Sequence, residues 1–167
     1  MLRCERSEPR STQGPMTETL FYHLERRSLD DVLPGLIEKT LERGWRAVIR
    51  TESSERADAI DGLLWTYNDQ TFLPHAQSGD GDPRRQPVLI TVEDENPNGA
   101  NVLFCVGGAM PGSWSAVNDL TRVVMMFDGR DEAALGKARS AWKDAKAAGH
   151  DVTYWKESPS GKFEKQD

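Results

Sequence analysis

The sequence predicts a single α/β domain in which a mainly parallel sheet lies between layers of helices. Short, almost wholly apolar runs recur along the chain, and such runs are typical of strands that are covered on both faces. Segments with apolar residues at helical spacing lie between several of these runs. Because strands that alternate with helices form parallel sheets between helical layers, this order predicts the α/β class. The chain has 167 residues, enough for one such domain with a sizeable core.

Six of the apolar runs are expected to form strands. They are rich in Val, Ile, Leu and Phe, and no internal repeat divides them into separate units. The predicted strands are Thr19–Leu24, Ala47–Ile49, Val88–Val92, Val102–Val106, Val123–Phe127 and Val152–Trp155.

Three helices are expected between these strands. Asp30 is a suitable capping residue for the first helix, and Gly44 stands where a glycine commonly ends one. Ser53 or Ser54 is expected to cap the second helix. The third helix is predicted from about Asp131 to Ala148 and is followed directly by a glycine.

The two ends of the chain are expected to lie outside the folded domain. Residues 1–16 are polar and are predicted to be a disordered extension, with Met16 as a candidate start of translation. The domain is predicted over residues 17–156. Residues 157–167 are expected to be a polar, frayed tail.

The net charge and the cysteines restrict the class of function. A formal charge of -6 argues against a general nucleic-acid-binding protein, although it leaves room for a local basic patch. No apolar run approaches the roughly 20 residues that a membrane-spanning helix needs. Cys4 and Cys105 form no CxxC pair and are interpreted as reduced thiols of a cytoplasmic protein.

The common signatures of catalysis are missing from the sequence. The turn after the first predicted strand has none of the glycines of a P-loop or of a dinucleotide-binding crossover. Gly107–Gly112 is interpreted as a chain reversal, and Asp80 with Asp82 as a solvated turn rather than a calcium loop. We therefore expect no catalytic residue, no cofactor and no metal. His75 is expected to pack in its surroundings rather than to act as a general base.

A basic stripe follows the last predicted helix. Arg139, Lys143 and Lys146 stand at helical spacing, and Trp142 borders them. One interpretation is a solvated face with a tryptophan that anchors the helix to the core. The other is a cationic groove for an acidic peptide with an apolar end residue, in which arginine holds a carboxylate by paired hydrogen bonds.

Large aromatic residues on a connecting loop form a second candidate surface. Trp65 ends the second predicted helix, and Phe72, Pro74 and His75 follow a polar turn. Such residues indicate either a pocket or an adhesive patch, because loops rarely find a core to fill. Since no catalytic motif accompanies them, a docking face for another protein is favoured.

Taken together, these segments resemble the chi subunit family of bacterial DNA polymerase III holoenzyme. The resemblance covers roughly residues 17–155, and it rests on the order and spacing of several short motifs. These motifs are Phe21-Tyr22-His23-Leu24, Leu63-Leu64-Trp65-Thr66, Thr71-Phe72-Leu73-Pro74-His75, Pro87-Val88-Leu89-Ile90, Ala138-Arg139, Trp142-Lys143 and Gly149.

The resemblance implies a Rossmann-like three-layer fold and a replication subunit associated with the clamp loader, without catalytic activity of its own. It implies binding of the acidic, Phe-ending C-terminal tail of single-stranded-DNA-binding protein by Arg139, Trp142 and Lys143. Where the family pattern has a second basic residue, the chain has Leu135. Two outcomes are open: Lys137 or Lys146 compensates for the lost charge, or the affinity for the tail is lower. DNA itself would be contacted only indirectly.

The resemblance also assigns the second surface. It implies that Trp65 and Phe72, with Pro74 and His75 beside them, meet the psi subunit or a helicase partner. Two other readings remain open at this point. One is a small nucleotide-dependent α/β enzyme, which ATP, GTP or NAD would stabilise against heat. The other is a helicase adaptor in DNA repair, which partner capture from a lysate would reveal.

Overall fold

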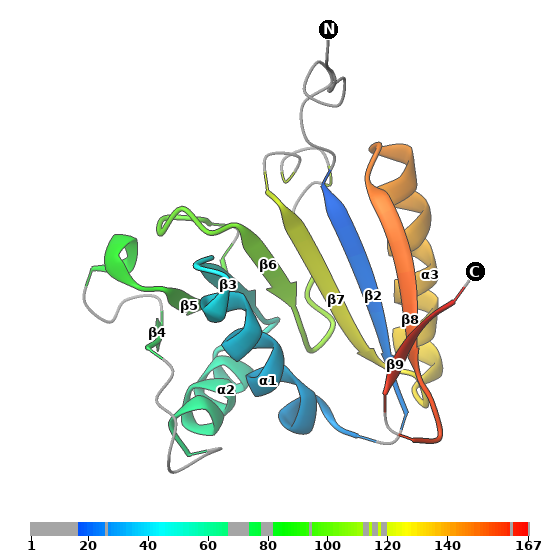
Figure 1. Cartoon of the computed structure of the whole chain (residues 1–167), viewed down its shortest axis with the longest axis horizontal. Coiled ribbons are helices and arrows are strands. Elements are labelled where there is room, and N and C mark those ends of the chain that lie inside the picture. The colour runs from blue at the N-terminus through cyan, green and yellow to red at the C-terminus, as the bar shows by residue number, and fades with distance from the viewer. Residues whose placement is uncertain are drawn as a thin grey trace, which may run out of the picture.

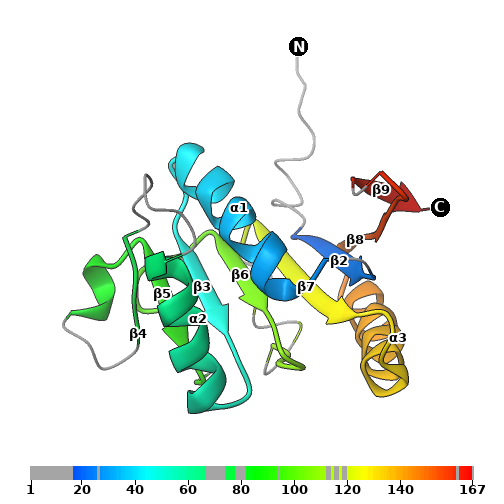
Figure 2. The ribbon, with the colours of Figure 1, turned by 90° about the horizontal axis from the view of Figure 1, so that it is seen from below.

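In the computed structural model, one sheet carries helices on both of its faces (Figures 1 and 2). The structure describes residues 17–25, 27–66, 74–77, 82–93, 95–111, 114, 117, 120–160 and 162–166. In this part of the chain α1 and α2 cover one face and α3 covers the other. No helix in the same residues is both long enough and apolar enough to cross a lipid bilayer.

Strands and helices alternate through most of the chain, as the sequence predicts. The elements are β2 (Glu18–Leu24), α1 (Leu29–Glu42), β3 (Ala47–Arg50), α2 (Ser54–Thr66), β4 (Ala76–Gln77), a 3₁₀ helix (Pro83–Arg85), β5 (Val88–Thr91), β6 (Val102–Cys105), β7 (Arg122–Asp128), α3 (Glu132–Ala147), β8 (Asp151–Glu157) and β9 (Phe163–Gln166). All six predicted strands are present with small shifts at their ends.

The sheet has eight strands among the described residues, in the order β4-β5-β3-β6-β7-β2-β8-β9. Every neighbouring pair is parallel except β8 and β9, which are antiparallel. The predicted α/β class with a mainly parallel sheet is therefore confirmed. The three layers also agree with the Rossmann-like fold that the resemblance implies.

Two hydrophobic layers hold the helices to the sheet. On one face, Leu33 and Ile37 of α1 pack with Phe104 of β6, and all three are almost fully buried. On the other face, Ala138 and Ala141 of α3 pack near Phe21 of β2, which has no exposed surface. Small alanines let α3 approach the sheet closely, so aromatic residues can fill the remaining space.

The two glycines predicted to end helices are confirmed, and the residue predicted to cap α1 is wrong. Gly44 and Gly149 follow α1 and α3 with φ of 79° and 89°, a region that favours glycine. The cap of α1 is Ser28 rather than Asp30. The Asp31 carboxylate accepts hydrogen bonds from the Ser28 backbone N–H and hydroxyl, both at 3.1 Å, which fixes the helix start two residues earlier.

The second and third helices begin as the sequence predicts. The Ser53 hydroxyl oxygen accepts a hydrogen bond from the Arg56 backbone N–H at 3.2 Å, so Ser53 is the residue that caps α2. Asp131 caps α3 by accepting from the backbone N–H groups of Ala133 and Ala134.

The C-terminal tail corrects a further expectation. Part of the segment expected to be frayed forms β9, which pairs with β8 at the edge of the sheet. The ring of Phe163 stacks on Tyr22, with centroids 4.9 Å apart, and this contact gives an otherwise polar strand a reason to pack. The predicted disordered extension, residues 1–16, lies outside the described residues.

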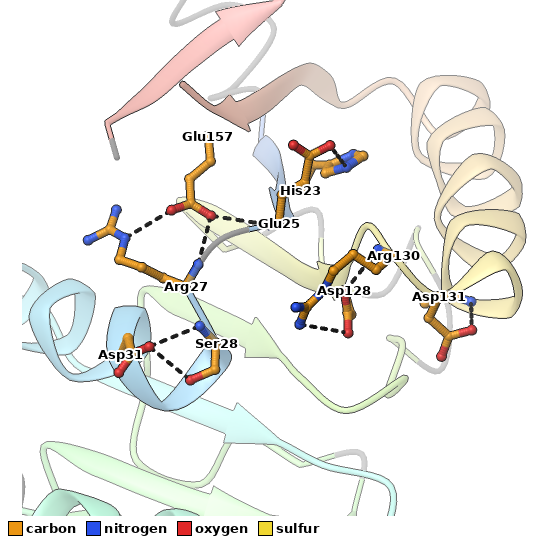
Figure 3. A network of polar contacts seen from close by, with 10 residues as sticks. His23, Glu25, Arg27, Ser28, Asp31, Asp128, Arg130, Asp131 and Glu157 are labelled. Atoms are coloured by element: carbon orange, nitrogen blue, oxygen red, sulfur yellow. Dashed lines mark hydrogen bonds and ion pairs between the residues drawn. The ribbon is translucent and has the colours of Figure 1, made fainter. Parts of the chain in front are cut away.

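A buried carboxylate fixes the turn that leads from β2 into α1 (Figure 3). The Glu157 side chain is fully buried at the end of β8 and accepts hydrogen bonds from the backbone N–H groups of Glu25 and Arg27. The Arg27 guanidinium adds a third contact, with Nε 3.0 Å from Oε2. These bonds compensate for the desolvation of a buried charge and tie the ends of β2 and β8 together.

We predict that Gly129→Ala destabilises the fold by about 1–3 kcal/mol, because the pocket around this glycine is already full. A Cβ atom there would lie 1.9 Å from Nε2 of the buried His23 ring. That ring is held at both nitrogens by Tyr154 and Glu25. Urea denaturation measures the change.

The matched control is Gly136→Ala, at an exposed position of α3 where nothing lies within 4 Å of the new atom. This change should stabilise the protein by about 0.5–1 kcal/mol through helix propensity. Equal effects of the two substitutions would contradict the predicted crowding at Gly129.

Candidate functional site

The outward side of α3 carries the basic stripe that the sequence predicts. Arg139, Lys143 and Lys146 are exposed, while the alanines of the opposite side are buried against the sheet. Within the part of the chain that the structure describes, no carboxylate forms an ion pair with any of these three residues. Their charges are therefore available to an external anion.

Trp142 belongs both to the core and to this surface. Its half-buried ring lies 5.5 Å from the Phe21 ring and 5.9 Å from the Tyr154 ring, measured between centroids. The Lys146 Nζ lies 5.3 Å from the Trp142 centroid, a cation–π distance. The anchoring role and the surface role proposed for this tryptophan are thus compatible.

Tyr154 is a member of this surface that sequence reasoning did not identify. Its ring lies 5.9 Å from the Trp142 ring, measured between centroids. Burial raises the pKa of its phenol, and the positive charge of Arg139 opposes part of that rise. The Tyr154 hydroxyl also hydrogen-bonds His23 Nδ1 at 2.5 Å. The alternation of side chains along a strand could have identified it, because Val152 and Tyr154 stand two residues apart and therefore point to the same face of the sheet. Both pack in the hydrophobic layer under α3. We call Arg139, Trp142, Lys143, Lys146 and Tyr154 the α3 surface.

The structure shows which lysine can compensate for Leu135, the residue that replaces a basic residue of the family pattern. Leu135 is half-buried on α3. Lys137, one of the two residues expected to compensate, instead points to another part of the molecule and pairs with Glu52 at 3.1 Å. Lys146 therefore remains as the basic residue that supplements Arg139 and Lys143.

The aromatic loop is only partly described. Trp65 is 56% exposed at the end of α2, and its ring centroid lies 5.0 Å from that of His75, which is buried. His75 Nε2 also lies 3.2 Å from Asp61 Oδ1. Pro74 is half-buried next to His75, while Phe72 lies outside the described residues. We call Trp65, Pro74 and His75 the α2 surface.

The α2 and α3 surfaces lie at opposite ends of the sheet. The α2 surface lies beside β4, the edge strand at one end of the strand order. The α3 surface lies over β2 and β8, near the other end (Figure 1). One ligand the size of a short peptide therefore cannot contact both surfaces.

A cavity of about 550 Å³ lies at the carboxyl ends of β2, β6 and β7. Ligands of open α/β sheets commonly bind in this position. Its charged walls include two internal ion pairs, Lys137 with Glu52 and Arg130 with Asp128. Hydrogen bonds from Arg130 also hold the pKa of the Asp128 carboxyl below its ordinary value.

Packing explains why a glycine stands at position 108, beside this cavity. Its φ is 90°, and a Cβ atom would lie 2.2 Å from a carboxylate oxygen of Glu52. Close packing in a sharp turn therefore accounts for this glycine, in agreement with the chain reversal expected for Gly107–Gly112. Among the described residues, no group of three or more His, Cys, Asp or Glu side chains is arranged to hold a metal ion.

Comparison with known proteins identifies the family. Residues 16–153 match the family described as DNA polymerase III chi subunit, HolC. The chain belongs to this family. A similar curated protein is the probable DNA polymerase III subunit chi of Rickettsia prowazekii (strain Madrid E), which is 33% identical over 91 residues. The match covers 54% of this chain and 55% of the relative, so it spans about half of each protein.

We predict that Trp142→Ala destabilises the protein by about 2–3 kcal/mol, because a half-buried ring that packs on Phe21 and Tyr154 is lost. Arg139→Ala and Lys143→Ala should each change stability by less than about 0.5 kcal/mol, because both side chains are exposed. Urea denaturation of the three variants measures this. A large loss of stability in Arg139→Ala would show that this residue supports the fold, and binding tests on it would then be uninformative.

Proposed function

We propose that this chain is a non-catalytic accessory subunit of DNA polymerase III in DNA replication, associated with the clamp loader. It links the polymerase assembly to single-stranded-DNA-binding protein by binding the acidic C-terminal tail of that protein. The family match supports the replication role. The observation that carries the tail-binding role is the combination of exposed Arg139, Lys143 and Lys146, which form no ion pair within the described residues, with the half-buried ring of Trp142.

Each residue of the α3 surface has a chemical role in this proposal. The Arg139 guanidinium holds the terminal carboxylate of the tail by two parallel hydrogen bonds. The rings of Trp142 and Tyr154, which pack on each other in a T-shaped arrangement, contact the ring of the terminal phenylalanine. Lys143 and Lys146 attract the acidic residues of the tail that precede this phenylalanine.

The charge of the whole protein makes this recognition selective. A protein with a net charge of -6 repels acidic partners at long range. Salt at physiological concentration screens that repulsion beyond about 8 Å, whereas close contacts with the three exposed cations of the α3 surface remain. An acidic peptide therefore needs the local arrangement of cations and rings, and acidity alone does not bring it to this protein.

The α2 surface is proposed as the face for a second protein, the psi subunit or a helicase. Trp65 is a large exposed aromatic residue at the end of α2, and tryptophans are frequent among the residues that dominate protein interfaces. The contact between the Trp65 ring and the buried His75 ring restricts the Trp65 side chain before binding, which lowers the conformational entropy that this side chain loses when a partner binds. In this proposal the subunit works in the cytoplasm, at the replication machinery of the nucleoid.

We predict that Arg139→Ala weakens binding of an acidic peptide that ends in phenylalanine by about 2 kcal/mol or more, roughly thirtyfold. The loss arises because the terminal carboxylate would become covered by the protein without its partner. Isothermal titration calorimetry with the intact chain measures the affinity.

The matched control is Arg130→Ala, an exposed arginine of equal charge that pairs with Asp128 outside the α3 surface. This variant should bind the peptide as the unchanged protein does. Equal affinities of the Arg139 and Arg130 variants would overturn the assignment of the α3 surface.

We predict that Trp65→Ala abolishes copurification with a coexpressed psi subunit or helicase from the same organism and leaves peptide affinity at the α3 surface unchanged. The change removes an exposed ring and should cost little stability. Pulldown followed by calorimetry separates the two functions. Loss of both interactions in Trp65→Ala would contradict two independent surfaces.

A further inference from the structure

Arginines from three separate segments gather at the amino ends of the parallel strands, where β3, β5 and β7 begin. Each lies at the end of α1 or just before or at the start of β3, β5 or β7. We call this group the arginine edge; its members are Arg43, Arg46, Arg84, Arg85 and Arg122. The proposed function assigns no role to it.

Hydrogen bonds and strand register place these arginines in a row. Arg46 Nη1 donates to the backbone carbonyls of Arg84 and Asn98, at 2.9 and 3.1 Å, which joins the start of β3 to the segment before β5. Arg122 begins β7, and β6 separates β7 from β3. Because neighbouring strands lie about 4.8 Å apart, the row from β5 to β7 is about 14 Å long.

Trp45 orders two of these arginines. The Arg43 and Arg122 guanidinium carbons lie 5.1 and 5.4 Å from the Trp45 centroid, in cation–π contact. The Trp45 ring packs against the core on the α1 side of the sheet. The Trp45 ring is therefore in contact with two arginines and with the core. By contrast, Trp142 on the α3 surface stands beside cations that pair with no carboxylate in the described part of the chain.

The arginine edge has more positive than negative charge. Asp82 pairs with Arg84 at 3.2 Å and lies 3.9 Å from Arg85, and Glu18 pairs with Arg122 at 2.7 Å. Among the residues that the structure describes, no carboxylate forms an ion pair with Arg43 or Arg46. Glu42 is exposed next to Arg43 in sequence. Asp151 is exposed opposite Glu18 in the register of β8 and β2. Among the residues that the structure describes, five arginines therefore stand beside four carboxylates in a protein that is acidic overall.

We propose that the arginine edge binds the phosphate backbone of single-stranded DNA. Planar guanidinium groups match phosphate oxygens by paired hydrogen bonds, and all five cations here are arginines. A row of about 14 Å is long enough to contact at least two consecutive phosphates of one extended strand. A single line of cations follows one strand, and contacts to phosphate carry no sequence preference.

An acidic peptide fits this edge less well than a nucleic acid does. Peptide recognition of this kind adds an apolar side chain in a slot, which supplies much of the affinity. At the arginine edge the aromatic ring is already covered by Arg43 and Arg122. Repeated charge without an apolar anchor is the chemistry of a phosphodiester backbone. This inference goes beyond the proposed function, in which the subunit reaches DNA only through a protein.

Fluorescence anisotropy with a labelled oligo(dT) of about 15 nucleotides tests the inference on the intact chain, between about 20 and 200 mM salt. We expect weak binding that falls with salt. The double variant Arg43→Glu/Arg85→Glu should lower the affinity at least tenfold. It should also make the slope of log affinity against log salt shallower by about 1.4, or about 0.7 for each lost phosphate contact.

The matched control is Lys162→Glu/Lys165→Glu, which changes the net charge equally at exposed positions around β9. It should lower the affinity less than threefold. Tail-peptide affinity should be unchanged in both double variants, and Arg139→Ala should bind oligo(dT) normally, so failure of this inference is distinguishable from failure of the proposed function. Thermal unfolding at the same temperature as the unchanged protein verifies that each variant is folded.

Several results would overturn the inference. These are no binding of oligo(dT) at about 20 mM salt, equal losses in the two double variants, or tighter binding of a duplex of the same length. Displacement of the oligo(dT) by polyglutamate at a lower concentration than by unlabelled oligo(dT) would assign the arginine edge to an acidic peptide instead.

Discussion

The position of β2 between β7 and β8 determines where the α3 surface forms. β7 and β8 follow one another in sequence, separated by α3, but in the sheet β2 lies between them and pairs in parallel with both. The connection between them, α3, therefore has to cross β2, and its alanines pack over Phe21. Trp142 then meets Phe21 and Tyr154, and this contact fixes which side of α3 faces outward with Arg139. The position and the outward side of the α3 surface thus follow from a strand order.

The same strand order separates the surfaces of the molecule. α1 carries the chain from β2 to β3, so the N-terminal half builds the end of the sheet that holds α2 and Trp65. α3 and β8 build the other end. Because a continuous sheet with two packed layers connects the ends, the α2 and α3 surfaces are held at a fixed separation. Such rigidity suits a connector, since little conformational entropy is lost when both partners bind.

Local patterns in the sequence were enough to predict the buried elements, and features that depend on distant residues were missed. The strands could be predicted because parallel strands are apolar along their whole length. β9 was missed because its one large apolar residue, Phe163, packs on Tyr22, about 140 residues earlier in the chain. Tyr154 was missed for the same reason, since only the pairing of β8 with β2 brings it to Trp142. The start of α1 was predicted two residues too late, at Asp30, because Ser28 and Asp30 are both residue types that cap helices well.

The arginine edge shows why net charge is a poor guide to local recognition. Its members are spread from Arg43 to Arg122 and form no basic run that a sequence scan would detect. The sheet gathers them because the beginnings of parallel strands meet at one edge. At physiological salt, charges farther away than about 8 Å are largely screened. An overall charge of -6 therefore limits nonspecific binding of polyanions, while it leaves room for the local anion binding proposed at the arginine edge and at the α3 surface.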